Sequence, residues 1–89
     1  MLSKKQRLQR EVNSMFLAAA RDNNLRFIEN LFRRNPRPQI DVIDKIGFTA
    51  LHYSALHNST PLYNFLLQKG AQDNIRSVRG YKASEIIFN

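Results

Sequence analysis

Few side chains in this chain have the types and spacing that catalysis requires. The two histidines, His52 and His57, are five positions apart. On a helix they would point about 140° away from each other, so they could not share a metal ion. Neither Ser54 nor Ser84 has both a histidine and a carboxylate at neighbouring helical positions to activate it as a nucleophile. This distribution predicts a protein with no metal site and no catalytic centre.

The remaining polar residues support the same prediction. The seven carboxylates form no motif pair for acid–base work, and the three glycines are isolated instead of forming a phosphate-binding loop. The chain has no cysteine, which excludes disulfides and thiolate metal ligands and allows a reducing compartment. We therefore expect no enzyme activity and no cofactor, and binding becomes the leading class of function.

The middle of the chain has the pattern of a helix–turn–helix unit. Gly47 lies where a tight turn with positive φ favours glycine, and Thr49 can cap the helix that follows. Thr60 predicts a second N-cap with Pro61 at the first helical position, and Gly70 predicts a left-handed C-cap. The apolar positions expected to face neighbouring helices are Leu51, Ala55, Leu62, Phe65 and Leu66.

Two partial copies of this unit flank it. Residues 19–32 align without a gap with residues 54–67, at an offset of 35 positions, and Asn23 occupies a left-handed turn position in this copy. A third copy opens near Gly80, which follows Gly47 by 33 positions. We predict a basic helical extension over 1–13 and a repeat domain over 14–89, with repeats at about 14–43, 44–76 and 77–89, the last incomplete.

The segment Asp44-Lys45-Ile46-Gly47-Phe48-Thr49-Ala50-Leu51-His52, with Gly70-Ala71-Gln72-Asp73-Asn74 after it, resembles an ankyrin repeat. The resemblance implies an all-α solenoid of stacked helix–turn–helix units, here with an added N-terminal helix. It also implies a scaffolding fold in which the ring of His52 ties neighbouring repeats together. We expect helices near 3–22, 25–34, 49–57, 61–69 and 81–88, with a capping box from Ser3 and Gln6.

Members of this family bind mostly through the turn tips and the exposed face of the inner helices. Carried over by position, the candidate protein-binding residues are Lys45, Ile46, Phe48, Leu56, His57, Arg76, Val78, Arg79 and Tyr81, with Arg21 and Asp22 in the first repeat. Phe48 and Tyr81 are either interface anchors or a turn-stabilising pair of packed rings, and the sequence leaves both interpretations open.

Charge is concentrated at one end of the chain. The formal net charge is +7, of which residues 1–37 contribute +6 (nine basic, three acidic) and residues 38–89 contribute +1 (five basic, four acidic). The predicted electrostatic patch consists of Lys4, Lys5, Arg7, Arg10, Arg33, Arg34 and Arg37. It is either a solvated face or an attraction site for an acidic protein, nucleic acid or anionic lipid. Phe16 and Phe27 lie on apolar stripes, so we expect them to be buried and unable to stack on bases.

These observations favour a non-catalytic protein-binding module, either an adaptor or a small structural subunit of a larger assembly. The alternative is a basic subunit that contacts RNA in a ribonucleoprotein, and a peripheral membrane contact comes third. Ile86, Ile87 and Phe88 have no obvious internal cover, so we expect a partner or further chain to cover them. No apolar run is long enough to span a membrane. We expect an intracellular protein, cytoplasmic, or mitochondrial if the basic N-terminus acts as a targeting segment.

Overall fold

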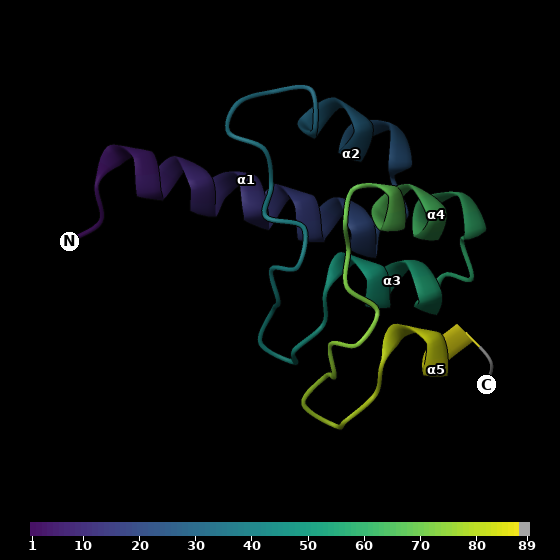
Figure 1. Ribbon diagram of the computed structural model, residues 1–89. Coiled ribbons are helices and arrows are strands. Elements are labelled where there is room, and N and C mark those ends of the chain that lie inside the picture. The colour runs from purple at the N-terminus through teal and green to yellow at the C-terminus, as the bar shows by residue number, and fades with distance from the viewer. Residues whose placement is uncertain (88–89) are drawn as a thin grey trace.

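The computed structural model describes residues 1–87 and contains five helices. They are α1 (Lys4–Arg21), α2 (Leu25–Leu31), α3 (Ala50–Leu56), α4 (Thr60–Gln68) and α5 (Ala83–Ile87). In Figure 1, α1, α3 and α5 follow one another in a row, and the long loops before α3 and before α5 extend to the same side. α3 packs against α1, α4 and α5, and α2 packs against α1. Over the described residues there is no strand, and the predicted all-helical repeat fold is confirmed.

Side-chain caps fix the start of the first three helices. The Ser3 hydroxyl accepts from the Gln6 amide at 3.1 Å, and the Gln6 side chain accepts from the Ser3 amide at 2.9 Å, which confirms the predicted capping box. Thr49 caps α3 in the same reciprocal way with His52. The side chain of Asn24 accepts from the amide of the residue at the third position of α2, at 3.2 Å.

The predicted cap of α4 is wrong by one residue. The Ser59 carbonyl accepts the first helical hydrogen bond, from the Tyr63 amide at 2.9 Å, so Ser59 and not Thr60 is the N-cap. The Ser59 side chain makes no capping hydrogen bond. Pro61 still lies in the first turn of the helix, where its missing N–H would have had no helical partner.

Two other helices are shorter than predicted. α2 ends at Leu31 instead of near residue 34, because the amides of Arg33 and Arg34 bond three residues back (3.1 and 3.3 Å) in a tighter turn that closes the helix. α5 begins at Ala83 instead of residue 81. The reason is that the Tyr81 carbonyl already accepts from the Ser77 amide at 2.9 Å, which holds this segment in a turn.

Two asparagines close the tight turns inside the first two helix pairs. Asn23 and Asn58 have φ values of +56° and +54°, the left-handed region that asparagine tolerates better than most residues. They are 35 positions apart, which is the offset found between the two sequence copies. The agreement supports the predicted alignment of the degenerate first copy with the middle one.

Three phenylalanines connect the two helix pairs through the core. Phe16 of α1 meets Phe32 edge-on at a centroid distance of 5.5 Å, and Phe32 meets Phe65 of α4 at 5.8 Å. Leu51 of α3 and Leu66 of α4 are fully buried beside them. The core therefore runs continuously from α1 to α4, as stacked repeats require.

Phe27 is a correction to the predicted core. Its side chain is 40% exposed, whereas Ile28 and Leu31 form the buried face of α2. Neighbouring helical positions differ by about 100°, so the inward position of Ile28 leaves Phe27 at the surface. Phe16 is buried as predicted.

The C-terminal apolar residues are partly accounted for. Ile86 is half-buried and packs against the core, so the expectation that it lacks internal cover is wrong. The Ile87 side chain and Phe88, which shared that expectation, lie outside the described residues. Among the helices of residues 1–87, none is both long and apolar enough to cross a membrane.

Candidate protein-interaction surface

The turn between residues 44 and 48 is organised by the carboxylate of Asp44. Its Oδ1 atom accepts from the backbone amides of Ile46 at 3.1 Å and of Phe48 at 3.0 Å, in the manner of an Asx turn. Its Oδ2 atom accepts from the hydroxyl of Tyr53 on α3. Both carboxylate oxygens therefore already have donors from within the chain.

Tyr53 connects this turn to the inner helix. Burial raises the pKa of Tyr53 above its ordinary value, and the hydrogen bond to Asp44 and the negative charge of that carboxylate raise it further, while Arg21 opposes the shift. The phenol is consequently a protonated donor at neutral pH, and it holds the turn in a fixed position relative to α3.

Gly47 allows the middle turn to touch the next one. Its φ is +78°, and a Cβ atom added there would lie 2.9 Å from the backbone nitrogen of Val78. At this contact the Val78 amide donates to the Ile46 carbonyl at 3.0 Å. Glycine is required both by the backbone conformation and by the close approach of the second turn.

His52 provides a second connection between the same two repeats. The Thr49 amide donates to Nδ1 at 3.1 Å, so Nδ1 carries no proton and Nε2 must carry it. Nε2 then donates to the Tyr81 carbonyl at 2.9 Å. The ring is 1% exposed. The structural role that the resemblance implied for His52 is confirmed.

The two joined turns enclose a groove of about 360 Å³. It is lined by Ile46, Phe48, Ser77, Val78, Arg79 and Tyr81, so five of the nine predicted protein-binding residues lie together. The Val78 side chain is 74% exposed and that of Ile46 is 53% exposed. Because these apolar side chains are exposed to solvent, the groove has a hydrophobic lining that a partner could cover.

The ring of Phe48 packs within its own repeat. Its ring stacks on His52 with centroids 4.9 Å apart and meets Tyr53 edge-on at 5.2 Å. Tyr81 is exposed at the other side of the groove. The rings of Phe48 and Tyr81 therefore share the groove, and the packing partners of Phe48 are residues of α3.

A second hollow adjoins the groove on the side of α1. It has a volume of about 410 Å³ and is lined by Arg21, Asp44, Lys45, Ile46 and Tyr53. Ile46 belongs to both hollows. Lys45, a predicted binding residue, and Arg21, carried over from the first repeat, therefore line a surface continuous with the groove.

The remaining predicted residues lie around this surface. Arg76 pairs with Glu85 at 3.5 Å and donates to the Gly80 carbonyl at 2.8 Å. Leu56 and His57 lie exposed at the end of α3, where the ring Nε2 of His57 bonds to the Arg21 carbonyl. Neither Leu56 nor His57 lines the groove.

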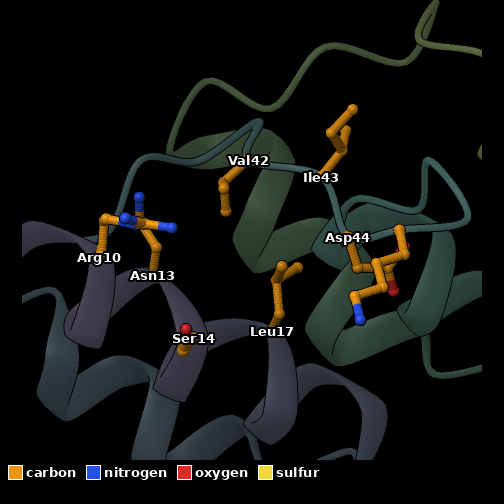
Figure 2. A pocket seen from close by; sticks show the side chains of 8 residues that line it. Arg10, Asn13, Ser14, Leu17, Val42, Ile43 and Asp44 are labelled. Atoms are coloured by element: carbon orange, nitrogen blue, oxygen red, sulfur yellow. The ribbon is translucent and has the colours of Figure 1, made fainter.

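A third hollow, of about 500 Å³, lies between α1 and the segment that leads into the turn. Figure 2 shows Val42 pointing toward α1 and Leu17, while Ile43 points away from the helix. The lining residues are Arg10, Asn13, Ser14, Leu17, Val42, Ile43, Asp44 and Lys45. It shares Asp44 and Lys45 with the second hollow, and we call the three hollows together the turn surface.

Leu17, Val42 and Ile43 of this surface were not among the predicted residues. A signal existed, because the apolar pair Val42-Ile43 directly precedes the turn residue Asp44. The neighbouring loop is held against α1 by buried Asn13, whose side chain accepts from the Gln39 amide at 2.9 Å. This contact joins segments 26 positions apart, and local sequence patterns do not reveal such pairings.

The predicted electrostatic patch is spread over two elements. Its members on α1 are Lys4, Lys5, Arg7 and Arg10, and its members in the loop after α2 are Arg33, Arg34 and Arg37, all of them exposed. A hydrogen bond of 2.8 Å from the Gln9 side chain to the Arg37 carbonyl brings the loop next to α1. Of the seven, Arg10 is the residue that lines the turn surface. Residues 1–87 contain no group of three or more His, Asp or Glu placed to hold a metal ion.

Comparison with known proteins agrees with this geometry. Residues 46–78 match the family model for the ankyrin repeat. Ankyrin repeat protein 14 of Vaccinia virus is 42% identical over 50 residues, which cover 56% of this chain and 21% of that protein. Ankyrin repeat domain-containing protein OPG023 of Monkeypox virus is also 42% identical over 50 residues, or 8% of its length. Palmitoyltransferase akr1 of Schizosaccharomyces pombe is 36% identical over 63 residues, covering 71% of this chain and 10% of that protein.

Stacked helix pairs with turns that project to one side define a helical repeat protein. Residues 46–78 of this chain are an ankyrin repeat. The chain spans about a fifth or less of the length of the relatives described above. An ankyrin repeat indicates a protein-interaction module, and the turn surface lies on this repeat and on the segments that flank it.

Proposed function

We propose that the chain is a non-catalytic protein-binding module that docks a partner protein on the turn surface. The observation that carries this proposal is the groove of about 360 Å³ between the two joined turns, whose walls are the exposed side chains of Ile46 and Val78. Fully burying such a side chain is worth about 1.5–3 kcal/mol. A partner that covers both would gain from contacts that are already positioned by the Gly47 approach and the His52 bridge.

The outer side of the first helix pair supports a role inside a larger assembly. Met15 and Phe27 are 41% and 40% exposed on the outer side of the first helix pair. Their counterparts 35 positions later, Ala50 and Leu62, are both 0% exposed in the core. Apolar side chains without cover on this side support contact with further protein, as a small structural subunit would make.

The nucleic-acid alternative draws on one observation, the exposure of the whole electrostatic patch. The arrangement of the aromatic rings favours nucleic-acid binding less than protein binding. Phe48 lies against His52 and Tyr53, which occupy its ring, so Tyr81 is the one exposed aromatic ring in the groove, beside the aliphatic side chains of Ile46 and Val78. Base stacking needs aromatic faces open to solvent. The protein-binding proposal therefore leads.

A capture experiment tests this proposal. The wild-type chain and three variants, Ile46→Ser, Val78→Ser and Leu67→Ser, are immobilised and exposed to an extract of the producing cells at high salt. Leu67 is the matched control, because it is exposed and apolar but lies on α4, away from the groove. We expect the same proteins on the wild type and on Leu67→Ser, and their loss from Ile46→Ser and Val78→Ser. Equal capture by all four would refute the proposed surface.

A further inference from the structure

The turn surface carries an excess of positive charge along its length. Arg10 lines the hollow beside α1, Arg21 and Lys45 line the middle hollow, and Arg79 lines the groove. All four side chains are exposed. The single carboxylate that lines the same surface is Asp44. Four cations thus face one acidic group.

The nearby carboxylates do not neutralise these cations. Asp44 already accepts from the amides of Ile46 and Phe48 and from the Tyr53 hydroxyl. Glu85 accepts from the Lys82 amide at 2.7 Å and pairs with Arg76. That pair is the one salt bridge among the side chains of the described part of the chain. The cations of the turn surface therefore have no carboxylate partner within the described structure.

Apolar side chains lie at both ends of this cationic strip. Ile46 and Val78 form the groove at one end, and Leu17, Val42 and Ile43 line the hollow at the other. The two sites are separated by the middle hollow with Arg21 and Lys45. A ligand that matches the strip needs apolar groups apart from one another and negative charge between and around them.

We propose that the turn surface takes an extended acidic segment of a partner protein. A large apolar side chain of that segment occupies the groove between Ile46 and Val78, and flanking Asp or Glu side chains face Lys45 and Arg79. This inference rests on the proposed function and adds the chemistry of the partner. Charge complementarity of this kind raises the association rate and selects among partners, while the apolar contact slows dissociation.

A peptide fits these observations better than RNA. The apolar positions are aliphatic, apart from the exposed Tyr81 and from Phe48, whose ring packs on His52 and Tyr53. A strand of RNA would meet the cations with its phosphates but would find few open aromatic faces for its bases.

The experiment is selection from a display library of random linear peptides on the immobilised full chain, followed by titration of a synthetic enriched peptide by fluorescence anisotropy. We expect enriched peptides to carry several Asp or Glu residues between and around large apolar residues. The double variant Lys45→Glu/Arg79→Glu should bind such a peptide roughly tenfold more weakly, from lost attraction and added repulsion.

The matched control is Arg33→Glu/Arg34→Glu, which makes the same change in net charge outside the turn surface. It should weaken binding by less than about twofold at physiological salt, because distant exposed charges are screened. Val78→Ser tests the apolar contact, and far-ultraviolet circular dichroism checks that every variant is folded. Equal losses in the two charge-reversed doubles would overturn a local role for Lys45 and Arg79.

The remaining outcomes separate this inference from the proposed function. Peptides that depend on Val78 but show no excess of acidic residues would overturn the acidic partner and leave the docking surface intact. No enriched peptide, together with a successful capture experiment, would show that the partner surface is not a linear segment. Displacement of the bound peptide by an oligouridylate, with no effect of Val78→Ser on either ligand, would assign the surface to nucleic acid instead.

Discussion

Replacing Gly47 with alanine should separate two effects that the structure combines at this residue. The first effect is backbone strain, because φ at Gly47 is +78° and an L-residue in the left-handed region costs about 1–2 kcal/mol. The second is steric. The new Cβ atom would lie 2.9 Å from the Val78 nitrogen, which is backbone and can yield only if the turn at residues 77–78 moves.

Moving that turn lengthens the hydrogen bond from the Val78 amide to the Ile46 carbonyl, which is 3.0 Å in the native protein. A backbone hydrogen bond contributes about 1 kcal/mol net. We therefore expect Gly47→Ala to lower the free energy of unfolding by about 2–3 kcal/mol.

Gly80→Ala is the matched control. Its φ is +89°, yet no atom lies within 4 Å of the added Cβ, so it carries the strain without the clash. We expect a loss of about 1–2 kcal/mol there. Urea denaturation followed by circular dichroism measures both values, and hydrogen exchange at the Val78 amide reports the turn contact directly. Equal destabilisation by the two substitutions, with unchanged protection of Val78, would refute the claim that contact between the turns requires glycine.

Three further expectations concern the core, the pH response and the exposed end. Leu51→Ala and Leu66→Ala should each lower the free energy of unfolding, measured by urea denaturation, by about 2–5 kcal/mol, because both side chains are fully buried. Losses below about 0.5 kcal/mol at both positions would mean that these side chains are not in the core. Burial raises the pKa of Tyr53, so its contribution to stability is fully present below the unfolded pKa near 10.0 and is lost as pH rises through the higher folded value. The wild type should thus lose more stability than Tyr53→Phe between about pH 9 and 11, and parallel curves would argue against the shift. We expect exposed Phe27 to promote self-association at high protein concentration, so Phe27→Gln should reduce it in sedimentation velocity. An unchanged profile would show that this exposed side chain is not a contact.

The features predicted correctly depend on residues close together in the sequence. Gly47, Thr49 and His52 lie within one turn and one helix start, where backbone conformation and capping chemistry decide the residue type. The ring of His52 then reaches the Tyr81 carbonyl, 29 positions away, and this link was accessible through the family resemblance alone. Asn23 was found because left-handed turns favour few residue types.

The features that were missed depend on orientation or on distant contacts. α2 has seven residues, so its apolar pattern fits a stripe through Phe27 nearly as well as one through Ile28. Packing against α1 decides between the two, and a periodicity argument cannot supply that information. Leu17 and Val42 share a hollow although they are 25 positions apart, because the loop between them folds back on α1.

The sharing of the groove between two repeats has a consequence for the energetics of binding. Val78 and Tyr81 belong to the last turn, which is held by the Gly47 contact, the His52 bridge and the packing of α5 on α3. A local opening of residues 75–87 would remove four of the six residues that line the groove while α1 to α4 remained folded. The apparent dissociation constant of any partner would then equal its intrinsic value divided by the fraction of molecules in which this segment is closed. Ala83 is buried in α5 and is not among the residues that line the groove, so Ala83→Gly would weaken binding through that fraction. Saturating partner would in turn slow hydrogen exchange throughout the segment.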